Sequence, residues 1–123
     1  MNRPIILIVD DEEKNREQVK DYISEIHSEC CFVEARNAAQ ALSILHRGLN
    51  PTLVILDYRM PMKTGVELNR EIKSCYGYFP TILWTGDFDS KDVQAAVTKK
   101  EVDACLPKTA SLKEFMAEVE KFL

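Results

Sequence analysis

Short apolar runs alternate with stretches of helical spacing along the whole chain. The most informative run, Leu53–Leu56 (LVIL), contains no polar residue and leads straight into Asp57. A run of this kind predicts a strand buried on both faces, as in a parallel sheet. Pro61 and Gly65 then indicate a loop. The sequence therefore predicts a single carboxylate, that of Asp57, at the point where a buried strand opens to solvent.

The other apolar runs predict further strands, and the amphipathic stretches between them predict helices. Strands are expected at Ile5–Val9, at Cys31–Ala35, at residues 79–84 and at residues 102–106. Helices are expected at about 13–27, from Asn37 to near Gly48, from Thr64 past Cys75, over 90–99, and from Ser111 onward. Three helix starts carry the capping-box pattern: Asn37-x-x-Gln40, Thr64-x-x-Glu67 and Ser111-x-x-Glu114.

This alternation of strands and helices predicts right-handed βαβ crossovers and a parallel sheet that is covered on both sides. A chain of 123 residues has the length of one domain, and no linker, repeat or low-complexity segment divides it. We therefore predict a single α/β domain over residues 1–123. Its expected fold is a doubly wound (βα)5, flavodoxin-like sandwich with strand order 2-1-3-4-5.

The composition is that of an ordinary globular protein, with 46% hydrophobic and 29% charged residues. A net charge of −4 argues against direct contact with nucleic acid, because phosphate backbones require clusters of Lys and Arg. No apolar run approaches the roughly 18 residues of a membrane span, so neither a membrane nor a secretory location is expected, and the chain is predicted to be cytoplasmic. The four cysteines, Cys30, Cys31, Cys75 and Cys105, lack zinc-ligand spacing and are expected to be free thiols.

Polar residues follow four of the five predicted strands. Asp10 and Asp11 close the first strand, Asp57 the third and Thr85 the fourth, and Lys108 follows the fifth. Since carboxylates that lie together repel one another, either their pKa values rise or a cation binds among them. Oxygen ligands favour Mg²⁺ or Mn²⁺ over zinc. A carboxylate beside such an ion is suited to forming an aspartyl-phosphate.

Four segments of the chain resemble the receiver domain of two-component response regulators. They are Val9-Asp10-Asp11-Glu12, Leu56-Asp57-Tyr58-Arg59-Met60-Pro61 with Gly65, Thr85-Gly86, and Leu106-Pro107-Lys108. The segments occur in the family's order and at about its spacing, so the resemblance covers essentially the whole chain.

The resemblance implies a phosphoacceptor. Asp57 would take a phosphoryl group from a sensor histidine kinase or a phosphotransfer protein. Mg²⁺ (or Mn²⁺) would be bound by Asp11, by Asp57 and by the backbone carbonyl of Arg59, while Asp10 would act mostly through water. Lys108 would contact the phosphoryl group, and Thr85 would turn toward it.

The resemblance also implies a switch. The surface of the fourth helix, fifth strand and fifth helix would change its affinity for an output partner or a C-terminal effector domain, and it could support a homodimer. Such a protein is not a turnover enzyme, because it catalyses only its own aspartyl phosphorylation and dephosphorylation. The chain fits both a stand-alone receiver and part of a longer regulator.

Two positions depart from the family pattern. Cys105 stands where receivers usually carry Tyr or Phe, so the coupling between Thr85 and the output surface is expected to differ. Thr109 stands where Pro usually follows the lysine in a cis peptide. A cis bond before a non-proline residue costs roughly 3 kcal/mol, so a trans peptide is expected here.

Two other functions compete with the phosphoacceptor. The first is a receiver-like interaction module that works without phosphorylation, which the departures at Cys105 and Thr109 allow. The second is a Mg²⁺-dependent phosphohydrolase, which would need a general acid near Asp57 that Tyr58 and Arg59 do not supply. Arg59 is instead expected to meet Asp87 across the mouth of the site and to shield the phosphoryl group from water.

Overall fold

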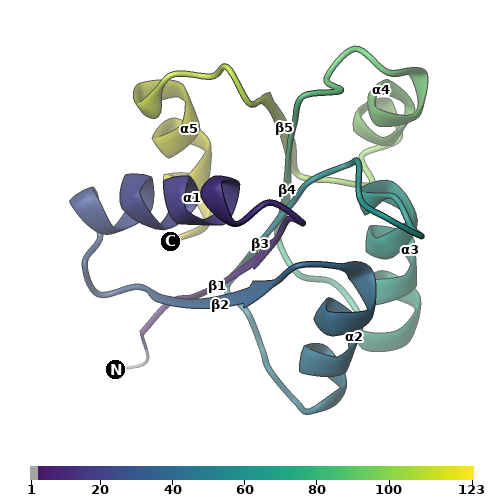
Figure 1. Cartoon of the computed structure of the whole chain (residues 1–123), viewed down its shortest axis with the longest axis horizontal. Coiled ribbons are helices and arrows are strands. Elements are labelled where there is room, and N and C mark those ends of the chain that lie inside the picture. The colour runs from purple at the N-terminus through teal and green to yellow at the C-terminus, as the bar shows by residue number, and fades with distance from the viewer. Residues whose placement is uncertain (1–2) are drawn as a thin grey trace.

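The computed structural model describes residues 3–123 and consists of a five-stranded parallel sheet between two groups of helices (Figure 1). The strands are β1 (Ile5–Val9), β2 (Cys31–Ala35), β3 (Leu53–Leu56), β4 (Thr81–Thr85) and β5 (Ala104–Pro107). The helices are α1 (Glu13–Ile26), α2 (Ala38–His46), α3 (Gly65–Tyr76), α4 (Lys91–Thr98) and α5 (Leu112–Val119), and a 3₁₀ turn (Glu120–Phe122) follows α5. Within residues 3–123, no helix has both the length and the apolarity that a membrane crossing requires.

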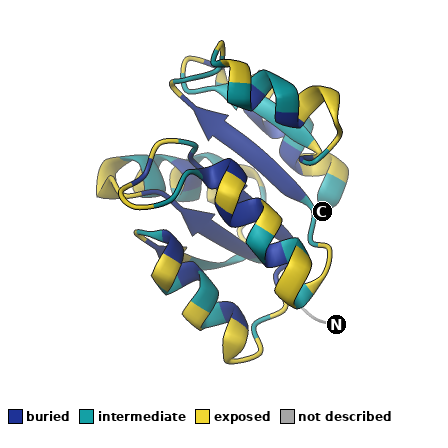
Figure 2. Cartoon of the chain, turned by 90° about the vertical axis from the view of Figure 1, so that its right-hand side faces the viewer, coloured by how far each residue is buried: buried dark blue, intermediate teal, exposed yellow. Residues whose placement is uncertain are grey.

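The strand order is β2-β1-β3-β4-β5, with every pair parallel, which confirms the predicted doubly wound, flavodoxin-like fold. Helices α1 and α5 cover one face of the sheet, and α2, α3 and α4 cover the other (Figure 1). The central strands β1, β3 and β4 are buried between these layers and the edge strands β2 and β5 are largely half-buried, while the outward faces of the helices are exposed (Figure 2). The order makes β1 and β3 neighbours at the switch point, where ligands bind in open α/β sheets.

Side chains alternate between the two faces along each strand, as the period of two requires. On the α1/α5 face, Ile6, Ile8, Leu53, Ile55, Ile82 and Trp84 pack against Val19, Ile23, Phe115, Met116 and Val119. On the α2/α3/α4 face, Leu7, Val9, Val54, Leu56 and Leu83 pack against side chains that include Ala41, Leu45, Val66, Leu68, Val93 and Ala96. Both faces of the central strands are therefore core, which explains why β3 reads as a continuous apolar run.

Two of the three predicted capping boxes are present in full. The Thr64–Glu67 pair at α3 and the Ser111–Glu114 pair at α5 each make both reciprocal hydrogen bonds. The pattern at α2 is different: the Asn37 side chain accepts from the backbone N–H of Gln40 (2.8 Å), but the Gln40 side chain accepts from Arg36, one residue before the cap (2.9 Å). The start of α2 was predicted correctly, although the Gln40 side chain accepts from Arg36 and not from the cap residue Asn37.

The predicted bounds of the last two strands were wrong by one or two residues. Strand β4 begins at Thr81 rather than at 79, after Pro80, which has no N–H to donate to a ladder, and it extends to Thr85. Strand β5 begins at Ala104 rather than at 102 and includes Pro107, which pairs with Thr85. Proline is tolerated there because β5 is an edge strand, as the sequence predicted.

Gly65 allows α3 to begin directly against the end of β3. Its backbone N–H donates to the carbonyl of Tyr58 (2.7 Å). A Cβ atom at this position would overlap the backbone carbonyl oxygen of Asp57 and would lie 3.2 Å from the Cα of Tyr58. Only a residue without a side chain leaves the Asp57 peptide in its place.

We expect Gly65→Ala to destabilise the protein by about 1–3 kcal/mol, the usual cost of overpacking, although alanine is otherwise the better helix former. Urea unfolding measures the change. Gly86→Ala is the matched control, because a Cβ there meets nothing within 4 Å. Equal stability of the two variants would show that the Asp57 carbonyl does not require the glycine.

Candidate functional site

The ends of β1, β3 and β5 bring three of the predicted site residues together. Asp10 follows β1, Asp57 follows β3 and Lys108 follows β5. Continued past the strand ends, the alternation of side chains places all three on the α1/α5 side of the sheet. Backbone hydrogen bonds fix these ends: the N–H of Asp57 donates to Val9 (2.9 Å), that of Asp10 to Ala35 (3.0 Å) and that of Lys108 to Thr85 (3.1 Å).

Three carboxylates share this edge of the sheet. Asp10, Asp11 and Asp57 each offer an oxygen, and these oxygens all lie within 4.8 Å of one another. Asp10 and Asp57 are buried, whereas Asp11 is exposed. The ammonium group of Lys108 lies 2.7 Å from Asp10 Oδ2 and 3.3 Å from Asp57 Oδ2. The ammonium group of this one lysine thus contacts two of the three carboxylates.

The Asp10 carboxylate already has several donors. Its Oδ1 accepts from the backbone N–H of Glu12 (2.9 Å) and from the Asn15 side chain (3.3 Å), and its Oδ2 accepts from Lys108. Asp11 and Asp57, by contrast, line an open cavity of about 350 Å³. Of the three clustered carboxylates, those of Asp11 and Asp57 are therefore the ones placed to take a further ligand in the cavity.

The pKa of Asp57 is raised above its usual range. Burial is the largest cause and the Asp10 carboxylate is the second, while Lys108 opposes both. The ionised form of Asp57 is thus destabilised in the folded protein. A cation in the cavity would reduce this destabilisation.

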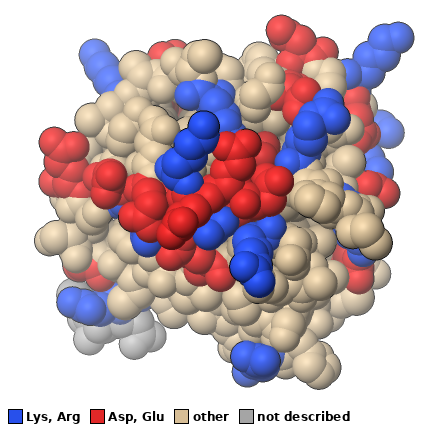
Figure 3. All heavy atoms as spheres, in the orientation of Figure 1, with Lys and Arg blue, Asp and Glu red and all other residues tan. Residues whose placement is uncertain are grey.

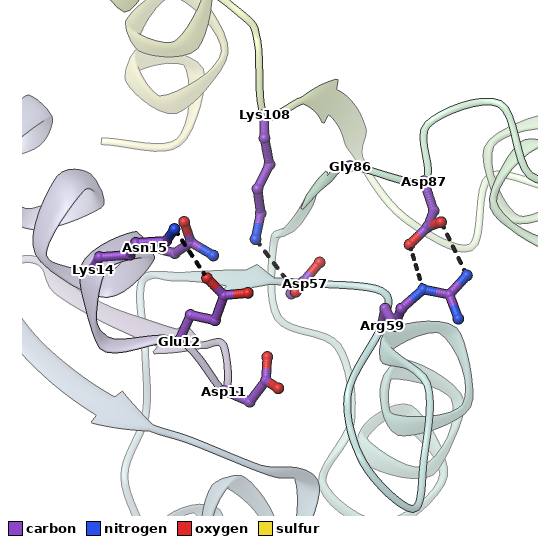
Figure 4. A pocket seen from close by; sticks show the side chains of 9 residues that line it. All are labelled: Asp11, Glu12, Lys14, Asn15, Asp57, Arg59, Gly86, Asp87 and Lys108. Atoms are coloured by element: carbon purple, nitrogen blue, oxygen red, sulfur yellow. Dashed lines mark hydrogen bonds and ion pairs between the residues drawn. The ribbon is translucent and has the colours of Figure 1, made fainter.

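The cavity lies within a band of acidic side chains that crosses this face, with basic side chains beside it (Figure 3). Side chains from the ends of several strands point into the cavity (Figure 4). It is lined by Asp11, Glu12, Lys14, Asn15, Asp57, Arg59, Gly86, Asp87 and Lys108. Asp10 and Thr85, which the sequence also predicted as site residues, are buried and are not part of this lining.

Thr85 lies at the end of β4 with its side chain fully buried. Its hydroxyl oxygen accepts a hydrogen bond from the backbone N–H of Asp87 (3.0 Å). In this arrangement the hydroxyl stabilises the β4–α4 turn, and a contact with a ligand at Asp57 would require the side chain to rotate.

Arg59 and Asp87 meet across the mouth of the cavity, as the sequence suggested. The guanidinium makes two hydrogen bonds to the carboxylate, from Nε to Oδ2 and from Nη2 to Oδ1, each 3.0 Å long (Figure 4). The neighbouring Tyr58 donates its hydroxyl to Asp92 in α4 (2.9 Å). Two consecutive residues after Asp57 therefore hold the segment that leads into α4.

The two departures from the receiver pattern are both accommodated. Cys105 is half-buried in β5 and packs against the α2/α3/α4 core, and burial raises the pKa of its thiol to about 11. The thiol is thus protonated at neutral pH. No peptide bond is cis within residues 3–123, so the Lys108–Thr109 bond is trans, as predicted.

Among the residues that line the cavity, Gly86 was quoted only as part of a motif, and Glu12, Lys14 and Asn15 were not predicted as site residues. A signal for them was present. They follow Asp10 and Asp11 directly and open the helix after β1, and the first turn of such a helix lies over the carboxyl edge of the sheet.

A family model for the response regulator receiver domain matches residues 6–120. The chain belongs to this family. Receiver domains of this kind are the signal-receiving part of two-component systems, so the predicted family is confirmed.

Curated relatives include the response regulator MprA of a Mycobacterium species (strain KMS), which is 29% identical over 118 residues, and VraR of Staphylococcus aureus, which is 28% identical over 116 residues. These alignments cover 96% and 94% of this chain but only 50% and 54% of the relatives. The chain thus spans about half the length of the curated relatives that it matches.

Solved receiver structures have the same fold. The signal receiver domain of an HD domain-containing protein from Pseudomonas fluorescens Pf-5 is 29% identical, with a TM-score of 0.86 and coverage of 98% of this chain and 94% of that one. The response regulator TrrA from Thermotoga maritima, solved in complex with Mg²⁺ and BeF, is 30% identical, with a TM-score of 0.81 and coverage of 98% and 99%.

We expect Asp57→Asn to stabilise the metal-free protein at neutral pH. Because the folded-state pKa of Asp57 is raised, the ionised carboxyl lowers stability as the pH rises from about 4, near the unfolded value, through the folded value. The gain in the free energy of unfolding in Asp57→Asn should therefore be present at pH 7 and vanish below about pH 4. Urea unfolding over this pH range, without divalent cations, measures the difference.

Adding Mg²⁺ should reverse the order of the two proteins, because a bound cation stabilises the wild type by mass action and the amide removes one ligand. If Asp57→Asn is instead less stable at pH 7 without metal, the attraction between Lys108 and Asp57 outweighs burial and the repulsion from Asp10.

Proposed function

We propose that this chain is the phosphoacceptor receiver of a two-component phosphorelay, in which Asp57 accepts a phosphoryl group from a sensor histidine kinase or a phosphotransfer protein. The observation that carries the proposal is the meeting of Asp57 with two further carboxylates and one lysine at an open cavity on the carboxyl edge of the sheet. In this scheme residues 1–123 form one receiver domain.

The carboxylate cluster fits a divalent ion. Its oxygen ligands suit Mg²⁺ (or Mn²⁺), and burial together with the charge of Asp10 raises the pKa of Asp57, as expected for a site that lacks positive charge. Asp11, Asp57 and the Arg59 backbone carbonyl would hold the ion, and Asp10 would act mostly through water. The ion, when bound, supplies neutralisation of the charge on the transferred phosphoryl group. The relative TrrA, solved with Mg²⁺ and BeF, supports this assignment.

The chemical step is a displacement at phosphorus. An oxygen of the Asp57 carboxylate forms the new O–P bond while the P–N bond of the phosphohistidine breaks, and the imidazole nitrogen leaves with the electron pair. Lys108, which already contacts Asp57, places a positive charge beside the oxygens of the group in transfer. Water later cleaves the acyl phosphate and regenerates the carboxylate. The protein turns over no other substrate.

The response of the rest of the molecule begins at Thr85. A phosphoryl oxygen on Asp57 would attract its hydroxyl, which would then give up the hydrogen bond from Asp87 and loosen the β4–α4 turn. The surface of α4, β5 and α5 would change in consequence. It would bind an output partner, a C-terminal effector domain or a second copy of the chain.

We expect the wild type to gain one phosphoryl group on incubation with acetyl phosphate and Mg²⁺, because acetate is a leaving group that needs no kinase. Intact mass spectrometry measures the gain. Asp57→Asn, and the wild type in excess chelator, should gain none. Trp84, which precedes Thr85 and is the sole tryptophan, should report the same event by a change in emission on adding Mg²⁺ and beryllofluoride.

No gain in mass with the wild type, together with unchanged Trp84 emission, would overturn the proposal. That result would favour a receiver-like interaction module that works without phosphorylation.

We further expect Arg59→Ala to shorten the lifetime of the acyl phosphate several-fold, because the ion pair with Asp87 covers the mouth of the cavity and limits the approach of water. The decay of the phosphorylated mass after removal of acetyl phosphate measures the rate. Arg70→Ala is the matched control, since Arg70 makes the same two-bond contact with Glu101 at a distance from the cavity. Equal decay in the wild type and in Arg59→Ala would show that the pair does not shield the site.

A further inference from the structure

Trp84 lies on β4, between the strand ends that carry Asp57 and Lys108. Its partner in β5 is Leu106, two residues before Lys108, and its neighbour Leu83 pairs with Leu56, the residue before Asp57. The indole is 2% exposed and belongs to the α1/α5 side of the sheet, as do Asp57 and Lys108. It is thus placed directly beneath the functional site.

The ammonium group of Lys108 lies over the face of this indole, 5.0 Å from the ring centroid. The same group lies 2.7 Å from Asp10 Oδ2. A lysine head group is carried by a flexible four-carbon stem, so its position depends on the partners around it. Here carboxylates and an aromatic face hold the ammonium group together.

Core packing alone does not explain a tryptophan at this position, because of the state of its indole N–H. It is buried and has no hydrogen-bond acceptor among residues 3–123. An unpaired buried donor costs stability, which a leucine or a phenylalanine in the same core would not incur. The compensating feature is the ring itself, because tryptophan has the aromatic face that attracts a cation most strongly.

Other aromatic side chains fix the orientation of the indole. Phe115 of α5 packs edge-to-face on Trp84, with centroids 5.7 Å apart and an interplanar angle of 69°. Tyr22 of α1 packs on Phe115 in the same manner, at 5.5 Å and 65°. The ring that faces Lys108 is therefore held by both helices on this side of the sheet.

From these contacts we infer that Trp84 is a positioning residue: its indole face holds the Lys108 ammonium group at the distance from which it contacts both Asp57 and the phosphoryl group. The expected effect on the rate of phosphorylation rests on the proposed phosphoacceptor function. The expected energetic coupling between Trp84 and Lys108 rests on the contact itself.

A double-mutant cycle between Trp84 and Lys108 tests the inference. Trp84→Phe keeps a weaker aromatic face, and Trp84→Leu removes it. We expect the rate of phosphorylation by acetyl phosphate to fall about twofold to threefold in Trp84→Phe and about tenfold in Trp84→Leu, in line with the strength of a desolvated cation–π contact. In a Lys108→Met background the same substitutions should change the residual rate by less than about twofold, because the cation is gone.

Val119→Ala is the matched control. It removes side-chain volume from the same buried core and makes none of the aromatic contacts that orient Trp84, so it reports the effect of lost core packing. Its rate should fall by the same factor with and without Lys108. Urea unfolding of every variant establishes that each is folded under the conditions of the rate measurement.

Equal effects of Trp84→Leu in the wild-type and Lys108→Met backgrounds would overturn the inference and leave Trp84 as core packing. If the wild type itself gains no phosphoryl group, the proposed function fails separately. The cycle is then evaluated on the unfolding equilibrium, where absence of coupling between Trp84 and Lys108 overturns the inference and coupling supports it.

Discussion

Crowding of negative charge at one edge of the sheet is the constraint on which the site depends. Three carboxylate oxygens lie within 4.8 Å of one another, and two of the three side chains are buried. Such a cluster requires raised pKa values or compensating positive charge. Lys108 supplies positive charge through its contacts with Asp10 and Asp57, and its ammonium group also lies over the face of Trp84. The raised pKa of Asp57 indicates that the compensation is incomplete.

Much of the fold and the acidic centre could be predicted because both follow from local rules. An apolar run such as Leu53–Leu56 is compatible with a strand buried on two faces, and an alternating series of strands and helices has few allowed topologies. Once the strand order is known, residues that end the strands must share an edge. Asp10, Asp57 and Lys108 could therefore be placed together although Lys108 and Asp10 lie 98 positions apart in sequence.

Other features could not be predicted because they depend on the third dimension. The pairing of Thr85 with Pro107 extends both β4 and β5, and a proline, which has no N–H to donate to a ladder, does not by itself indicate a strand. The Gln40 side chain accepts from the N–H of Arg36 and not from that of the cap residue, Asn37. These two donors are one position apart in sequence, and only the geometry of the loop determines which of them is bonded. The contact between Lys108 and the face of Trp84 required knowledge of which side of β4 the indole occupies.

The alternation of side chains along β4 places neighbouring residues on opposite faces of the sheet, where they pack against different helices. Trp84 lies on the α1/α5 side with Lys108, whereas Leu83 and, in β5, Cys105 pack on the side of α2, α3 and α4. The side chain at position 105 therefore contacts the core beneath α4, on the face of the sheet away from Trp84 and Lys108. A change in the volume of that side chain must be accommodated among Leu83, Val93 and Ala96 before it can reach the acidic edge.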